Sequence, residues 1–196
     1  LLLKYVDHSS NAIGNGVNET VITLKDDKYP VTVKLHYVAY GKENIIRTFT
    51  EISHEEKKPV ILCKYASSML HLNSSKYFLT EFSGDWAHEA NVTERELAFG
   101  KKVIDTKLGA RANMFVSPFF QLALDNPSQE NAGEVLVGTI GWTGNFRFTF
   151  EVDNKNELRI ISGINPYDSE YSLPAREVFR TPDFYFTYST QGKGEA

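Results

Sequence analysis

Residues 146–161 read Phe-Arg-Phe-Thr-Phe-Glu-Val-Asp-Asn-Lys-Asn-Glu-Leu-Arg-Ile-Ile, and this stretch indicates how the whole chain folds. In its first half, large apolar side chains alternate with polar ones, which is the period-two pattern of a strand with one buried face. Four polar, turn-forming residues follow at Asp153–Asn156, and then a second apolar run at Leu158–Ile161. The stretch therefore predicts a β-hairpin.

The same alternation recurs along the chain. In Val31–Tyr40, apolar side chains at the odd positions predict a core face, and the even positions, His36 and Val38 among them, predict a face nearer solvent. Further strands are predicted at Thr20–Leu24, Asn44–Ile52, Val60–Ala66, Tyr77–Phe82, Phe119–Leu124, Glu134–Ile140 and Phe184–Tyr188. Because so many short strands exceed what one open sheet holds, we predict two packed antiparallel sheets.

Little of the chain has a helical pattern. Thr93–Phe99 has the best one, since Thr93 and Glu96 have the spacing of a capping box, and it predicts one helical turn. Gly14-Asn15-Gly16 predicts a loop. No repeat, low-complexity tract or linker divides the sequence, and 196 residues fit one all-β domain, residues 1–196.

Charge and composition argue against several partners. The formal net charge is −4, from 25 acidic and 21 basic residues without a basic run, so we predict no nucleic-acid or acidic-membrane partner.

No apolar stretch approaches the roughly 20 residues of a membrane span. Leu1–Val6 is too short for a signal peptide and lacks its basic flank. The single cysteine, Cys63, follows the apolar run Val60–Leu62, which predicts a buried side chain and excludes an internal disulfide.

No motif for nucleotide, metal or serine-hydrolase chemistry occurs. The sequence lacks G-x-G-x-x-G, G-K-[ST] and G-x-S-x-G. No two histidines have the i, i+4 spacing of a zinc-binding helix, so each is expected to be exposed or hydrogen-bonded: His8, His36, His54, His71 and His88. The two carboxyl groups of a catalytic pair come together only in the folded protein, so their spacing in the sequence gives no signal. None of the 25 acidic residues stands out from a solvated surface by sequence alone. We therefore predict no cofactor and no metal in this chain, and the pattern leaves open a pair of carboxylates for glycoside cleavage.

Two short segments combine a tryptophan with glycine and polar residues. In the first, Phe82–Glu89, Trp86 lies between Asp85 and Glu89. An indole in such a place stacks on the apolar face of a sugar while its neighbours bind hydroxyl groups. The alternative is a tryptophan packed in the core at a strand end.

The second segment is Ile140–Phe146. It places Trp142 and Asn145 in a frame of glycines, which again suits sugar binding. The same pattern is also typical of a β-bulge or a tight turn.

At these segments the chain resembles the amino-terminal domain of glycoside hydrolase family 36, the α-galactosidase family. The resemblance rests on an ordered series of motifs: Gly84–Glu89, Ser117–Phe120, Gly133–Val135, Gly141–Phe146, Gly163–Pro166, Phe179–Pro182 and Tyr188–Gly192. In the family these look like G-x-W-x-x-E, N-P-F, G-E-V, W/Y-S-G-N-F, G-I-N-P, F-x-T-P and Y-S-x-x-G. Ser117 stands where the family usually has Asn, and Thr143 where it usually has Ser.

The resemblance implies a galactose-mutarotase-like β-supersandwich of two large packed antiparallel sheets, followed in the parent enzyme by a (β/α)8 barrel. Family members retain anomeric configuration with two barrel aspartates, one as nucleophile and one as acid/base. Neither aspartate lies in this chain, so residues 1–196 alone are expected to be inactive. The resemblance also implies a bacterial enzyme of the cytoplasm or periplasm, raffinose-type or other α-galactosides as substrates, and assembly into a homo-oligomer.

Under this interpretation the domain packs on the barrel, shapes the rim of the galactose pocket and supports oligomers. Trp86 is the first candidate to reach the substrate, with Asp85 and Glu89 as hydroxyl ligands, and Trp142 and Asn145 come second. An autonomous carbohydrate-binding module and a pure assembly domain are the alternatives. An exposed aromatic platform would favour the module, whereas a large bare apolar face would favour the assembly domain and also fit the α-galactosidase domain.

Overall fold

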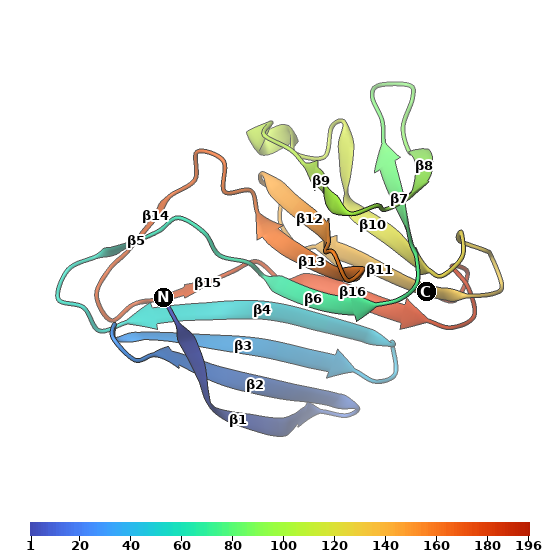
Figure 1. The fold of residues 1–196 in the computed structure, drawn as a ribbon. Coiled ribbons are helices and arrows are strands. Elements are labelled where there is room, and N and C mark those ends of the chain that lie inside the picture. Colours follow the sequence, from blue (N-terminus) through green and yellow to red (C-terminus); the bar gives the residue numbers. More distant parts are fainter.

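The computed structural model describes residues 1–196, and almost every element in it is a β-strand (Figure 1). One sheet has ten strands, in the order β1 (Leu3–Gly14), β2 (Val17–Asp26), β3 (Val31–Tyr40), β4 (Ile45–His54), β16 (Phe184–Ser189), β11 (Glu134–Ile140), β10 (Val116–Leu124), β7 (Tyr77–Ser83) and β8 (Asn91–Glu96), with β15 (Val178–Arg180) also paired to β4. The second has four, in the order β6 (Ser68–Asn73), β13 (Glu157–Ile164), β12 (Phe146–Val152) and β9 (Gly100–Asp105). A ribbon pairs β5 (Val60–Leu62) with β14 (Tyr171–Leu173).

The pairing of these strands confirms the predicted all-β fold. Every ladder between named strands is antiparallel. The only helix is the short 3-10 turn η1 (Gly109–Arg111). The structure therefore contains no helix that is long and apolar enough to cross a membrane.

The hairpin predicted from residues 146–161 is present as β12 and β13. Phe146 pairs with Ile164, and Val152 pairs with Leu158 at the turn. Asp153 closes this turn because its side chain accepts hydrogen bonds from the backbone N–H groups of Lys155 (2.8 Å) and Glu157 (2.9 Å). Asn156 takes the left-handed conformation (φ 63°), which asparagine tolerates better than most residues.

A layer of phenylalanine rings fills the space between the two sheets. The inward face of β12 supplies Phe146, Phe148 and Phe150, all buried. They face Phe120 of β10, whose ring centroid lies 5.2 Å from that of Phe148 and 4.9 Å from that of Phe150, edge to face. Aromatic pairs in this geometry add about 0.5–1.5 kcal/mol beyond their area burial.

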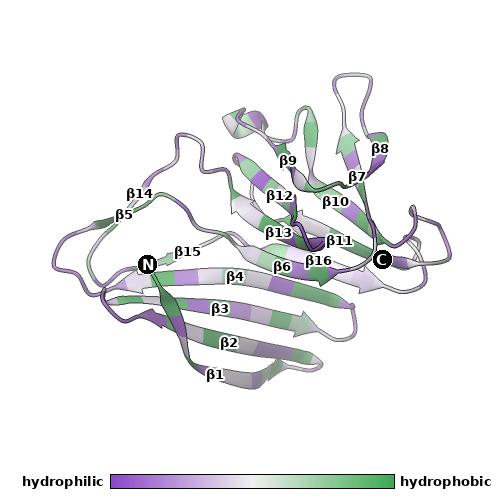
Figure 2. Ribbon diagram, viewed as in Figure 1, coloured by the Kyte–Doolittle hydropathy of each residue, from purple (hydrophilic) through white to green (hydrophobic).

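The two sheets differ in extent, so half of the larger sheet has no covering layer. The core has 17 buried residues, and none of them comes from β1–β4. In Figure 1 these four strands continue below the four-stranded sheet, and the ribbon of β5 and β14, the chain leading into β6 and the amino-terminal end of the chain lie near them. Apolar residues nevertheless continue along them, as Figure 2 shows.

One prediction for Val31–Tyr40 is wrong. The strand is present as β3, but Val38, assigned to the solvent side, has no exposed surface. Its direct cross-strand neighbours are Glu19 and Arg47, and long charged side chains of this kind cover apolar groups with their stems. His36, on the same face, is mostly covered: its ring stacks on Phe49 at 4.2 Å, and its nitrogens lie 3.1 Å from Glu19 and 3.3 Å from Glu51.

Two further expectations are also wrong. Thr93–Phe99 contains no helical turn, because residues 91–96 form β8, an exposed edge strand whose ladder with β7 outweighs the local capping pattern. Cys63 is exposed. Its strand, β5, ends at Leu62, so the cysteine lies on the connection and not on the buried side of a strand.

Besides β8, five strands lie where none was expected. These are β1, β6, β9, β14 and β15, and β1 is exposed along its whole length. β1 has no buried face and therefore lacks the alternation by which strands are found, whereas β14 and β15 have only three residues each. The loop predicted at Gly14-Asn15-Gly16 is confirmed as the turn between β1 and β2, with Gly16 at φ 80°.

Replacing Phe148 with alanine tests the aromatic layer. The substitution removes a fully buried ring that packs on Phe120 and Phe184. We expect the free energy of unfolding, measured by urea denaturation, to fall by about 3–5 kcal/mol. Phe99→Ala is the control, because that ring is 78% exposed, and its effect should stay within about 0.5 kcal/mol. Equal effects of the two substitutions would contradict the core described above.

Candidate functional site

All the residues predicted to form a site lie at one end of the sandwich, which we call the loop end. Here β7, β9, β11 and β13 finish and β10, β12 and β16 begin, as the pairs Ser83–Val116, Asp105–Arg147 and Ile140–Phe184 require. The connections that gather there are residues 84–90, 106–115, 141–145, 165–170 and 181–183. The hairpin of β7 and β8 and the turn η1 rise at the top of Figure 1.

The turn between β7 and β8 presents Trp86 to solvent. The side chain is 87% exposed, so the alternative of a core tryptophan is wrong. Asp85 accepts a hydrogen bond from the backbone N–H of Trp86 (2.7 Å), and Glu89 accepts one from the N–H of Ala87 (3.2 Å). The two predicted hydroxyl ligands thus also shape the turn that carries the indole.

Steric constraints fix the path of this turn. Ala87 and Ala90 both have positive φ, 62° and 56°, which is uncommon for residues with a Cβ. A Cβ on Gly84 would lie 3.0 Å from both Glu89 Cα and His88 O, so the chain crosses itself closely at that glycine. The N–H of Gly84 donates to the carbonyl of Phe115 (3.0 Å), which ties the turn to the 106–115 connection.

The second predicted segment forms the turn between β11 and β12. Trp142 is 41% exposed, and its indole covers Gly144 so closely that a Cβ there would lie 2.8 Å from Nε1. Asn145 Oδ1 accepts a hydrogen bond from the N–H of Gly109 (2.7 Å), and its backbone carbonyl accepts one from Asn165 (2.9 Å). Asn145 therefore links its own turn to two neighbouring connections of the loop end, to residues 106–115 through its side chain and to residues 165–170 through its backbone.

The two predicted segments are thus separate turns that both bond to the 106–115 connection, one through Phe115 and one through Gly109. The structure brings Asp85, Trp86 and Glu89 together in the first turn and Trp142 and Asn145 together in the second. The predicted residues therefore form two separate groups at the loop end.

The sequence analysis did not predict a partly buried network of polar side chains at the loop end. Asn165 is 1% exposed and donates to the carbonyl of Thr106 (2.9 Å) and to Asp105 (3.3 Å). Arg147 donates two hydrogen bonds to the same oxygen of Asp105, at 3.0 and 2.6 Å. The G-I-N-P motif at residues 163–166 was the available signal, but the sequence does not say which groups the asparagine bonds.

Carboxyl groups with shifted pKa values lie away from the loop end. Hydrogen bonds from Ser74 and Ser75 lower the pKa of Asp125, those from Arg159 and then Lys101 lower that of Glu151, and backbone N–H groups lower that of Asp153. A general acid for glycoside cleavage needs the opposite shift. No group of three or more His, Cys, Asp or Glu side chains is placed to hold a metal ion.

The fold places the chain in the class of β-supersandwich domains with a galactose-mutarotase-like fold. A putative aldose 1-epimerase from Escherichia coli superposes on 94% of this chain with a TM-score of 0.52, at 5% identity and over 69% of its own length, which is a likeness of fold alone. The crystal structure of the family 36 α-galactosidase AgaA from Geobacillus stearothermophilus superposes on 97% of the chain with a TM-score of 0.88 and 27% identity.

The sequence identifies the family. The model of the glycosyl hydrolase family 36 N-terminal domain matches residues 2–174, and the chain belongs to this family. The α-galactosidase AgaA is 30% identical over 96% of the chain, and α-galactosidase Mel36A from Lactobacillus acidophilus is 26% identical over 97%. The chain spans only 25% and 26% of those two enzymes, respectively.

Replacing Asn145 tests its linking role. Asn145→Ala removes the acceptor of the Gly109 N–H, so we expect that amide to exchange its hydrogen roughly tenfold faster, as measured by NMR. Asn145→Asp keeps an acceptor oxygen at the same place and should preserve slow exchange. Equal exchange rates in the two variants would show that this hydrogen bond does not hold the loop.

Proposed function

We propose that this chain is the non-catalytic amino-terminal domain of a retaining α-galactosidase that removes terminal α-galactosyl groups from raffinose-type sugars. The observation that carries the proposal is the match to the family 36 N-terminal domain over residues 2–174, in a chain that spans a quarter of its relatives. Structures of AgaA variants have been solved in complex with stachyose and with raffinose, which supports this substrate class.

The proposed division of labour assigns catalysis to a (β/α)8 barrel elsewhere in the polypeptide. Retaining glycosidases need two carboxyl groups about 5–5.5 Å apart, one of which has a raised pKa. The lowered pKa values of Asp125, Glu151 and Asp153 belong to turn and ion-pair carboxylates. Residues 1–196 then act as one domain that packs on the barrel, shapes the rim of its pocket and supports oligomers.

Within this domain, the loop end is the part proposed to approach the substrate. Trp86 is the best placed residue, because its indole is 87% exposed on a turn whose backbone is sterically fixed. A rigid exposed ring stacks on a sugar at a small cost in conformational entropy. Asp85 and Glu89 flank the ring as hydroxyl ligands, and Trp142 and Asn145 form the second part of the same rim.

Comparing the 196-residue chain with the full-length protein tests the division of labour. We expect the full-length protein to hydrolyse a chromogenic α-galactoside and the 196-residue chain to give only the uncatalysed rate. Hydrolysis by the shorter chain would mean that a carboxylate pair lies within these residues. Absence of activity in both would contradict the assignment to an α-galactosidase.

Trp86→Ala in the full-length enzyme tests the contact with substrate. We expect kcat/KM for raffinose to fall on the order of tenfold, about 1.4 kcal/mol, with the unfolding midpoint unchanged. Phe99→Ala is the matched control, because it also removes an exposed ring, from the connection after β8 at the opposite end of the domain. An unchanged kcat/KM in the Trp86 variant would remove this residue from the substrate side.

The exposure of Trp86 also favours a second candidate function, that of an autonomous carbohydrate-binding module. The two candidates differ in what the 196-residue chain does alone. A module binds raffinose or galactose in isothermal titration calorimetry, whereas a domain that only completes the rim of a barrel pocket does not.

A further inference from the structure

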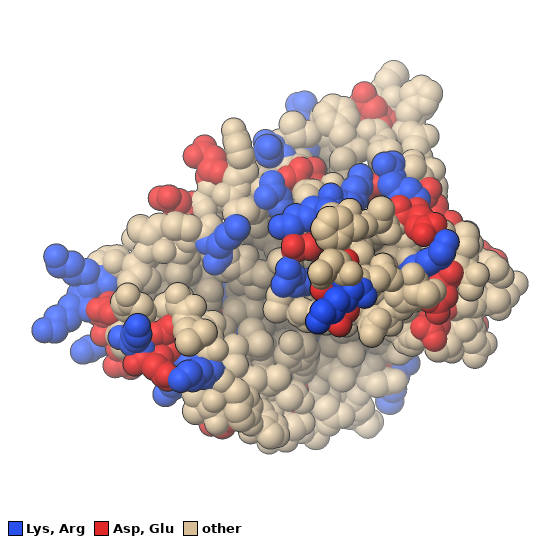
Figure 3. Space-filling view, in the orientation of Figure 1, with Lys and Arg blue, Asp and Glu red and all other residues tan.

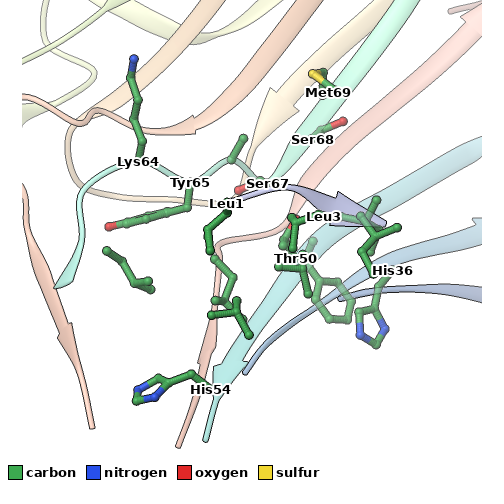
Figure 4. Close-up of a pocket in the computed structure, with 18 of the residues that line it drawn as sticks. Leu1, Leu3, His36, Thr50, His54, Lys64, Tyr65, Ser67, Ser68 and Met69 are labelled. Carbon is green, nitrogen blue, oxygen red and sulfur yellow. The ribbon is translucent and has the colours of Figure 1, made fainter. Parts of the chain in front are cut away.

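Two hollows in the surface differ in their chemistry, and the first is an apolar groove. It lies on the half of the large sheet that has no covering layer, and 16 of the 24 residues that line it are hydrophobic. In Figure 3 the charged side chains lie around this groove. Its lining includes Tyr65, Ser67 and Ser68 from the segment that leads into β6, and Leu1 and Leu3 from the amino-terminal end (Figure 4).

The second hollow is a polar cleft on the outer face of the ten-stranded sheet. Its volume is about 570 Å³, and only two of its eight lining residues are hydrophobic. β7, β8 and β10 form its floor, and the segments 125–133 and 190–194 line its side. Tyr77 and Leu79 of β7 belong to the core, so the alternate residues Thr80 and Phe82 face outward into the cleft.

The floor of the cleft joins a polar row of side chains to an apolar pair. Thr80 pairs with Glu94 of β8 on one side and with Gln121 of β10 on the other, so three polar side chains lie in a row across the sheet. The next pair on the same face is Phe82 and Val92, and both are apolar. A pyranose ring has a matching combination, because its hydroxyl groups surround a face of C–H groups that stacks on aromatic rings.

The carboxylate of Glu94 is held in place for a ligand. Its Oε2 accepts hydrogen bonds from the hydroxyl of Thr80 (3.1 Å) and from the N–H of Ser128 (3.1 Å), and Thr80 is only 3% exposed. Both bonds go to one oxygen, so Oε1 remains as an acceptor for a hydroxyl group. Gln121 is half-buried on the other side of Thr80, and its amide offers both a donor and an acceptor.

The side of the cleft carries charges of both signs. Lys193 Nζ lies 3.8 Å from Glu130 Oε2, and the backbone N–H of Lys193 donates to the carbonyl of Gln129 (2.9 Å), which fixes this segment beside the cleft. With Glu94, the cleft has two carboxylates and one ammonium group, a net charge of −1 that disfavours an anion. A Ca²⁺ ion needs about six to eight oxygen ligands, and Lys193 repels it. The lining therefore suits a neutral ligand with hydroxyl groups.

We infer that this polar cleft binds one glycosyl unit of a neutral saccharide. One face of the sugar stacks on the ring of Phe82, which packs on Phe119 with the ring centroids 5.1 Å apart. The sugar hydroxyls donate to Glu94, exchange hydrogen bonds with the amide of Gln121 and accept from Lys193. None of the residues predicted from the sequence to bind sugar lines this cleft, and the inference does not rest on the proposed function.

Hydrogen exchange in the full-length protein, followed by mass spectrometry, tests this site. The probes are methyl β-galactopyranoside, methyl α-glucopyranoside and sucrose, which are neutral and carry no α-galactosyl group that the enzyme would remove. At least one of them should slow the exchange of the backbone amides of residues 126–132 and 190–194 roughly twofold or more. The half-maximal effect is expected at a concentration on the order of 1 mM, because a ligand this small gains little affinity in an open cleft.

Three variants assign the protection to the cleft. Glu94→Gln and Gln121→Ala each remove a proposed hydrogen-bonding group, so each should raise the half-maximal concentration roughly tenfold. Glu96→Gln is the matched control, because this glutamate lies two residues further along the same face of β8 and does not line the cleft, and it should leave the concentration unchanged. An unfolding midpoint equal to that of the unmodified protein verifies that each variant is folded.

Several results would overturn the inference. One is that none of the sugars protects these segments at concentrations up to about 100 mM, far above the expected midpoint. Another is equal protection in the unmodified protein and in both cleft variants, or slower exchange of residues 84–90 alone, because the sugar then binds elsewhere. Protection in the 196-residue chain but not in the full-length protein would mean that another part of the polypeptide covers the cleft.

Discussion

The contact of Phe120 with the rings of β12 is the interaction on which the rest of the structure depends. Phe120 has no exposed surface and touches Phe148 and Phe150 edge to face. It fits because β11 has a glycine opposite it: a Cβ on Gly138 would lie 2.5 Å from Phe120 Cζ and 2.8 Å from Phe184 Cζ. Gly138 thus leaves room for both rings on the inner face of the ten-stranded sheet, and its strand β11 ends two residues later, at Ile140, where the turn with Trp142 and Asn145 begins.

The unequal extent of the two sheets determines the shape of the molecule. Where both are present, their inner faces form a continuous core, and where only β1–β4 remain, the same apolar alternation lines an open groove. A bare apolar face was expected to favour an assembly domain and also to fit the amino-terminal domain of an α-galactosidase. The family match favours the second of these, because family 36 enzymes carry this domain as one part of a longer chain.

Hydrogen bonds to the backbone hold the turns of the loop end in place. Asp85 and Glu89 bond to the backbone of the turn that carries Trp86, and Asn145 bonds to Gly109 of the adjoining connection. At the same end, Asn165, Asp105 and Arg147 join three chain segments in a partly buried network. Such supporting hydrogen bonds hold exposed rings in one geometry and so lower the entropic cost of binding.

The sequence by itself determined the all-β class, the hairpin of β12 and β13, most strands with a buried face, and the family. These follow from local alternation and from the order of short motifs, both of which are readable along one chain. Only the tertiary structure decided that residues 91–96 pair with β7, that Cys63 is exposed, and that Val38 is covered by Glu19 and Arg47. It also decided that Trp86 points into solvent and that the second sheet stops at β6. Each of these depends on which distant segments become neighbours, and no local pattern encodes that information.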